Sequence, residues 1–219
     1  MDVLTDWLTY VQTNFDFILE ETINHARISL TAVAAATVVA VLLGVFIQPR
    51  PLLRAPVQSI VGIFLTIPSL ALFALFVPLV GIGNSAAIAA LFLYALLPIL
   101  RNTVAGLDAV SPAVVESAKG MGMNRTQLLL RVRLPLAYPV IMAGVRVSTL
   151  LAVSIAAIAA LVGGDGLGTF IDTALGRLGL PNSENQLWTG TIFIVLLGLV
   201  LDIVLATVQR FTTPRGLKL

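Results

Sequence analysis

The sequence predicts an all-α membrane protein with about five membrane-spanning helices. Of its 219 residues, 58% are hydrophobic and only 11% are charged, and the mean hydropathy is +1.01. That composition leaves too little polar surface for a water-soluble domain of this size. Long uncharged runs are the second observation, because roughly 20 helical residues are needed to cross a lipid core of about 30 Å.

The predicted spans follow these uncharged runs in chain order. Residues 28–47 supply the first run. The next run, from Ala55 to Leu100, is too long for a single crossing, and the turn-like sequence at 81–85 divides it into two. After a polar stretch, two further runs complete the set. The predicted spans are 28–47, 57–80, 86–100, 140–162 and 188–208.

The basic residues predict the orientation. Ten of them fall in segments on one side of the spans, and they are Arg50, Arg54, Arg101, Lys119, Arg125, Arg131, Arg133, Arg210, Arg215 and Lys218. Because basic loops favour the cytoplasmic side, we expect the N-terminus outside and the C-terminus inside. The expected organisation is an extracytoplasmic segment 1–26, a transmembrane domain 27–209 with a cytoplasmic loop 101–139, and a cytoplasmic tail 210–219.

Few catalytic chemistries are compatible with this composition. The chain has no cysteine and a single histidine, so we expect no thiolate or imidazole metal site and no Ser/His/Asp triad. His25 is most simply an interfacial residue beside Arg27. The glycine-rich sequence at 163–168 lacks the lysine of a phosphate-binding loop and is expected to form a tight turn. No nucleic-acid partner is expected, since the basic residues lie beside apolar runs.

The loop 101–139 is long enough to hold structure of its own. Ser111 is a suitable N-cap with Pro112 at the first helical position, which predicts a short helix that ends at the following glycines. Asn124 with Gln127 three residues later forms a capping-box pattern for a second short helix, which Pro135 is expected to stop. Two helices joined by a glycine hinge predict a docking element.

This loop resembles a motif of ABC-importer permeases. The matching residues, with Ser117 in place of Ala and Val132 in place of Ile, are Glu116-Ser117-Ala118, Gly122, Val132, Leu134 and Pro135. The resemblance implies a type I ABC importer transmembrane domain whose coupling helix sits in a cleft of an ATP-hydrolysing subunit. The residues it assigns to coupling are Glu116, Ser117, Ala118, Gly120, Gly122, Arg125, Leu134 and Pro135.

Further segments are similar to permeases of glycine betaine, carnitine and choline importers, over most of the chain from Ile28. They are 66–71, 95–103, 119–123, 143–146, 163–168 and 213–217. Asp165 departs from the pattern, because relatives more often have a small residue at that position. The resemblance implies a permease in the inner membrane of a prokaryote that acts with ATPase subunits, a second identical or paralogous permease and an extracytoplasmic binding protein. This chain would hold no cofactor, and ATP and Mg would bind the ATPase.

Other functions stay open on the residues alone. A permease for methionine or another amino acid would share the coupling loop. A carrier driven by protons or sodium would place ionisable sites near the midplane, and an intramembrane enzyme would need a catalytic constellation. The sequence shows neither of these features.

Two sets of polar residues fall within the spans. Arg146 and Asp202 lie at similar predicted depths, and because isolated charges are costly in a membrane they are candidates for a buried ion pair, within one subunit or across a dimer. The candidates for lining a pathway are Thr66, Ser69, Thr149 and Ser154. The aromatic residues are scattered, so no cage for a quaternary ammonium group is predicted.

Overall fold

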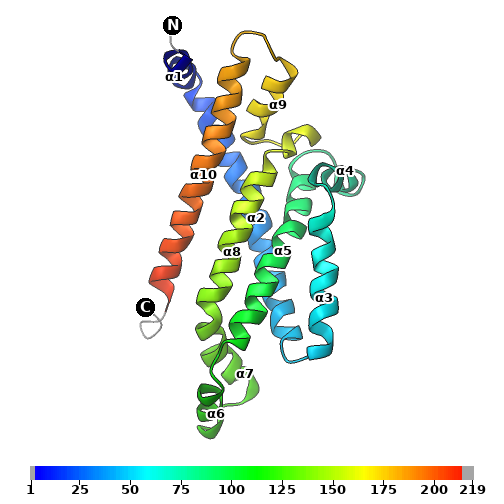
Figure 1. Cartoon of the computed structure of the whole chain (residues 1–219), viewed down its shortest axis with the longest axis vertical. Coiled ribbons are helices and arrows are strands. Elements are labelled where there is room, and N and C mark those ends of the chain that lie inside the picture. The colour runs from blue at the N-terminus through cyan, green and yellow to red at the C-terminus, as the bar shows by residue number, and fades with distance from the viewer. Residues whose placement is uncertain (1–2, 214–219) are drawn as a thin grey trace.

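The computed structural model describes residues 3–213, and every regular element in that range is a helix (Figure 1). The α-helices are α1 (Val3–Thr13), α2 (Phe15–Ile47), α3 (Pro51–Ile63), α4 (Ser69–Val80), α5 (Asn84–Asp108), α6 (Pro112–Gly120), α7 (Arg125–Leu128), α8 (Leu134–Ala156), α9 (Gly168–Gly176) and α10 (Ser183–Thr212). Short 3-10 helices occupy Phe64–Thr66 and Ala159–Val162, and a π-helical turn occupies Leu129–Arg133.

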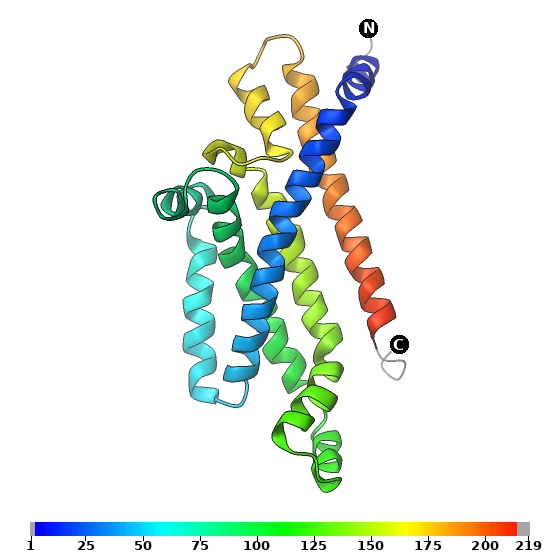
Figure 2. The ribbon, with the colours of Figure 1, turned by 180° about the vertical axis from the view of Figure 1, so that it is seen from behind.

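Helices α2, α5 and α8 lie side by side and form the centre of the bundle (Figures 1 and 2). Small residues allow their close approach. Gly44 of α2 packs on Thr103, and Gly144 of α8 packs on Asn102, at distances that leave no room for a Cβ atom. Helix α10 runs along the edge and contacts α8 and α9.

The number of membrane-spanning helices agrees with the prediction, but one span has a different shape. Four helices are long and apolar enough to cross a membrane, and the bent pair α3–α4 makes up to five. The predicted span 57–80 is broken near its middle, because α3 and α4 meet at 99°. Ile67 is extended before Pro68, and the proline has no N–H to continue the helix. The hydroxyl of Tyr94 donates to the Ile67 carbonyl at 2.5 Å and fixes the bend.

Pro135 does not stop the helix that α7 begins, contrary to the prediction. Residues 125–156 form one continuous span. The π-helical turn directly before Pro135 widens the turn in which the proline ring would otherwise meet the carbonyl of Arg131. The same helix ends at Ala156, earlier than the predicted limit of residue 162, and a 3-10 turn follows.

Other helices extend beyond their predicted limits, α2 and α5 the furthest. Helix α2 begins at Phe15 and runs without a break past residue 26, where the sequence suggested a boundary. Its first turns are held by long-range contacts that a hydropathy pattern does not contain. Helix α5 continues to Asp108, so the connecting loop is shorter than 101–139. At the other end of the chain, residues 214–219 of the expected tail lie outside the described residues.

Candidate functional site

Helix α6 stands at one end of the molecule as the first part of a projecting helical hairpin (Figure 1). Ser111 precedes it as predicted, but the Ser111 side chain makes no capping hydrogen bond. Its backbone carbonyl instead accepts from Val114 at 3.1 Å and from Val115 at 3.2 Å. Pro112 begins the helix, where a missing N–H has no cost.

Gly122 ends α6 in a conformation that favours glycine. The N–H of Gly122 donates to the Lys119 carbonyl at 2.9 Å, and the N–H of Met123 donates to the Ala118 carbonyl at 3.2 Å. This pair of bonds is a Schellman motif, which needs a left-handed residue after the helix. Gly122 has φ of +78°, and no atom lies within 4 Å of the position that a Cβ would occupy. The space beside this turn is therefore open to a partner.

The predicted capping box of the second short helix is confirmed. The Gln127 N–H donates to Asn124 Oδ1 at 2.9 Å, and the Asn124 N–H donates to Gln127 Oε1 at 3.0 Å. The two bonds satisfy backbone donors at the start of α7 and fix its direction. We call the segment from Ser111 to Arg133 the coupling element.

The residues assigned to coupling fall into two groups. Six belong to the hairpin, and among these Ala118 is buried while the other five are exposed: Glu116, Ser117, Gly120, Gly122 and Arg125. Leu134 and Pro135 lie apart from them, in the first turn of α8. Leu134 packs on the cluster of Leu107, Ala137 and Ile141. The hairpin thus presents polar and flexible positions outward, and Leu134 anchors its second end.

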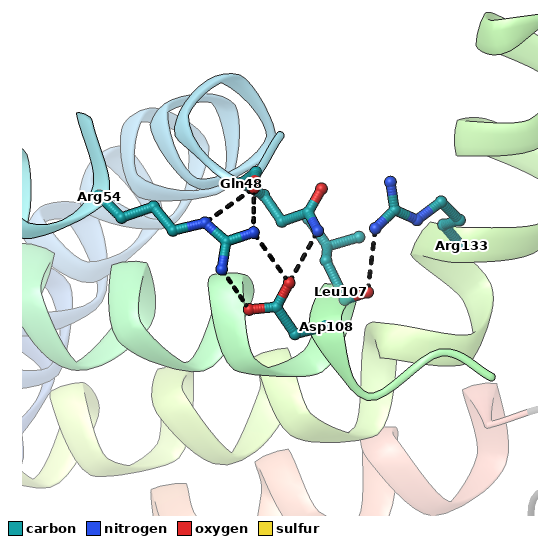
Figure 3. Close-up of polar contacts among 5 residues, drawn as sticks. All are labelled: Gln48, Arg54, Leu107, Asp108 and Arg133. Atoms are coloured by element: carbon teal, nitrogen blue, oxygen red, sulfur yellow. Dashed lines mark hydrogen bonds and ion pairs between the residues drawn. The ribbon is translucent and has the colours of Figure 1, made fainter. Parts of the chain in front are cut away.

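A polar cluster at the base of this element was not predicted from the sequence (Figure 3). Arg54 donates to both carboxylate oxygens of Asp108, at 2.9 and 3.1 Å, and its Nε donates to the backbone carbonyl of Gln48 at 2.8 Å. Gln48 Nε2 donates to Asp108 Oδ1 at 2.7 Å. The signal that could have found it is Asp108 itself, an acid at the end of a span on the basic side.

Arg146 and Asp202 lie within the membrane-spanning helices and form a two-pronged ion pair. Arg146 Nε and Nη2 each lie 2.8 Å from one carboxylate oxygen of Asp202. The side chains are 34% and 27% exposed, so the pair is half-buried in this chain. It joins α8 to α10 within one subunit, and charge-assisted bonds of this geometry fix orientation as well as distance.

A family model described as "binding-protein-dependent transport system inner membrane component" matches residues 24–214, which is most of the chain. The chain belongs to this family. It is therefore the membrane-spanning permease subunit of a binding-protein-dependent transporter, located in the inner membrane, and is not an enzyme.

Several curated permeases are similar to this one over nearly their whole length. The glycine betaine/carnitine/choline transport system permease OpuCB of Bacillus subtilis is 40% identical, with 98% of this chain and 97% of that protein covered. The choline transport system permease OpuBB of the same species is 41% identical, with 95% and 94% covered. The osmoprotectant import permease OsmW of Salmonella typhimurium is 37% identical, with 97% and 100% covered.

The fold of the permease is also found in a solved transporter. Its structure is similar to a chain of the MetNI methionine ABC transporter in an inward-facing conformation, with a TM-score of 0.78 and 23% identity. The match covers 98% of this chain and 100% of that one. At this identity the likeness shows the fold, and the all-helical importer architecture expected from the sequence is confirmed.

The four hydroxyl residues suggested for a pathway are not brought together in the permease subunit. Thr66 and Ser69 flank the bend between α3 and α4, whereas Thr149 and Ser154 lie on α8. The hydroxyl groups of Thr66, Thr149 and Ser154 each donate to a carbonyl of the preceding helical turn. Thr149 is buried and Ser154 is exposed.

At the opposite end of the permease, the glycine-rich sequence 163–168 forms the predicted turn, with positive φ at Gly163 and Gly166. The Asp165 N–H and Asn84 Oδ1 lie 2.8 Å apart, and Asn84 Nδ2 donates to Asp165 Oδ2 at 2.7 Å. This reciprocal pair ties the turn to the start of α5, which gives the unusual Asp165 a structural role.

His25 is fully buried, so the interfacial position expected for it is wrong. Its Nε2 atom lies 2.9 Å from the Val153 carbonyl of α8. One turn earlier on the same helix, the carboxylate of Glu21 accepts from the Gly166 N–H. Tertiary contacts with α8 and the glycine-rich turn thus account for the positions of Glu21 and His25.

Proposed function

We propose that the chain is the permease of an ATP-driven importer for a small quaternary ammonium compatible solute such as glycine betaine, carnitine or choline. The observation that carries this proposal is the identity of about 40% to osmoprotectant permeases over nearly the full length of both chains. The likeness to a methionine transporter is lower in identity and supports only the fold. ATP and Mg would bind a separate ATPase, and a second permease subunit would complete the pathway.

The experiment is uptake by the whole complex in proteoliposomes. The permease is assembled with its ATPase and binding protein, and ATP-dependent accumulation of radiolabelled glycine betaine, carnitine, choline and methionine is compared. We expect accumulation of one or more quaternary ammonium solutes. Accumulation of methionine alone would favour the amino-acid importer instead.

The exposed hairpin supports a role for the coupling element as the docking site of the ATPase. Its outward face carries Glu116 and Arg125, and the open space beside Gly122 can admit a partner surface. Docking there requires the hairpin to lie on the cytoplasmic side. The distribution of basic residues predicts the same orientation, with the N-terminus outside.

This orientation predicts opposite labelling of two engineered cysteines. Asp16 lies in the first turn of α2 and Thr126 in α7, and both are exposed. The start of α2 and helix α7 are near opposite ends of the molecule (Figure 1), and the sequence has no cysteine. In intact cells an impermeant maleimide should label the Asp16→Cys variant and not the Thr126→Cys variant. After permeabilisation both should react. Labelling of Thr126→Cys in intact cells would contradict the orientation.

We expect solute preference to follow the binding protein more than the permease. Recognition of a permanent cation calls for a desolvated aromatic cage, and the aromatic residues of this chain are dispersed along it. Binding proteins of different preference are exchanged on the same membrane complex, and uptake of each solute is measured. A preference that stays with the membrane complex after the exchange would indicate a specific site within the helices.

A further inference from the structure

The coupling element makes most of its contacts within itself. Helix α6 packs against α7 and the π-helical turn. A displacement of α6 can therefore reach the membrane-spanning helices mainly through the two ends of the element. One end is the short link 109–111 after α5, and the other is the π-helical turn that continues into α8.

A hydrogen bond joins these two ends. Arg133 lies in the π-helical turn, and its Nη2 atom donates to the backbone carbonyl of Leu107 at 3.1 Å. Leu107 is fully buried in the last turn of α5. The bond crosses the base of the coupling element (Figure 3), so it links the end of α5 to the turn that continues into α8, where the hairpin leaves the bundle.

The next residue, Asp108, extends this link to α2 and α3. Gln48 is the C-cap of α2 and is buried, and Arg54 lies in the first turn of α3. Both donate to the carboxylate of Asp108, and Arg54 also binds the Gln48 carbonyl, so the three residues form a closed set of hydrogen bonds.

The ion pair of Arg54 and Asp108 fixes the relative position of two helix ends more than it stabilises the fold. The side chains of Arg54 and Asp108 are 31% and 40% exposed, and ion pairs that water reaches add little to the free energy of unfolding. The planar fork of arginine on a carboxylate nevertheless fixes the angle and distance between the groups that carry it. The pair is thus suited to hold the α2–α3 turn in register with the end of α5.

We propose that Gln48, Arg54 and Asp108 form a positioning clamp that makes the α2–α3 hairpin follow movements of the coupling element. The clamp sets how much solute is transported for each ATP hydrolysed. This inference rests on the proposed docking of an ATPase at the coupling element. Without the clamp, the ATPase would still bind and hydrolyse ATP, but part of each displacement would not reach α2 and α3.

The test measures solute transported per ATP hydrolysed by the full complex with its ATPase and binding protein in proteoliposomes. For Arg54→Ala we expect unchanged co-purification of the ATPase, retained ATP hydrolysis and a ratio lowered about 3- to 10-fold. Arg54→Lys keeps the charge without the planar fork, and its ratio should lie between those of the unsubstituted permease and Arg54→Ala. Arg50→Ala is the matched control, because Arg50 lies in the same turn but is not part of the clamp. Its guanidinium instead stacks on Phe46 of α2, with 4.0 Å from its Cζ atom to the ring centre.

A second pair of variants separates positioning from folding. The exchanged pair Arg54→Asp with Asp108→Arg should recover much of the ratio, and the near-isosteric Asp108→Asn should assemble normally with a lowered ratio. An unchanged ratio in Arg54→Ala would overturn the clamp, as would loss of ATPase binding in both Arg54→Ala and Asp108→Asn. Failure of the unsubstituted permease to bind an ATPase would instead overturn the proposed function.

Discussion

Replacement of Gly122 by valine should strongly lower coupled transport while the permease still inserts into the membrane. The residue has φ of +78°, which a β-branched side chain adopts at a cost of about 1–2 kcal/mol. That strain falls on a short hairpin outside the bundle, so insertion is unaffected. A new side chain would also project into the open space beside the turn, where we propose that the ATPase docks. Together these effects should lower uptake by more than about tenfold.

Two control variants separate the backbone effect from the docking effect. Gly179 has φ of +82° and equally open surroundings, but lies on the α9–α10 connection at the far end of the molecule (Figure 1). Gly179→Val therefore imposes the same strain away from the docking site and should leave ATPase binding intact. In Gly122→Asn, the asparagine can adopt a positive φ, but its side chain still projects into the open space beside the turn. Normal transport by Gly122→Val would contradict the role of this turn.

Removal of one partner of the Arg146–Asp202 pair should strongly destabilise the permease. Asp202 lies seven residues before Gln209 in the last turn of α10, about 10 Å along the helix, so its carboxylate falls within the predicted span. An unpaired charge inside a span costs up to about 2–3 kcal/mol. Arg146→Leu and Asp202→Leu should each lower the unfolding temperature in detergent and the yield of folded protein.

The double replacement distinguishes pairing from independent roles. Arg146→Leu with Asp202→Leu removes both charges, and such exchanges of an ion pair for apolar residues are often neutral. Its unfolding temperature should therefore lie well above that of either single variant. Arg177→Leu, a change at an exposed arginine between α9 and α10, is the control. Additive losses in the double variant would show that the two charges do not depend on each other.

Much of the molecule could be predicted from local features of the sequence. The number of spans follows from the lengths of uncharged runs. The capping box of Asn124 and Gln127 follows from spacing, since its hydrogen bonds join residues three apart. The motif from Glu116 to Pro135 could be read because it resembles that of known permeases. The spans and the capping box could be read because each depends on residues that are contiguous or closely spaced in the sequence.

The tertiary structure decided what depends on distant partners. Arg54 meets Asp108 across 54 residues, and Glu21 meets Gly166 across 145, so no local spacing contains these contacts. The same reason explains why His25 was misplaced, since its partner Val153 lies on another helix. The sequence by itself determined the class of protein, the number of spans and the capping box. Only the packed bundle decided which polar groups share a site. A polar group in an apolar environment needs a hydrogen-bonding partner, and helix packing determines which distant residue comes close enough to be that partner.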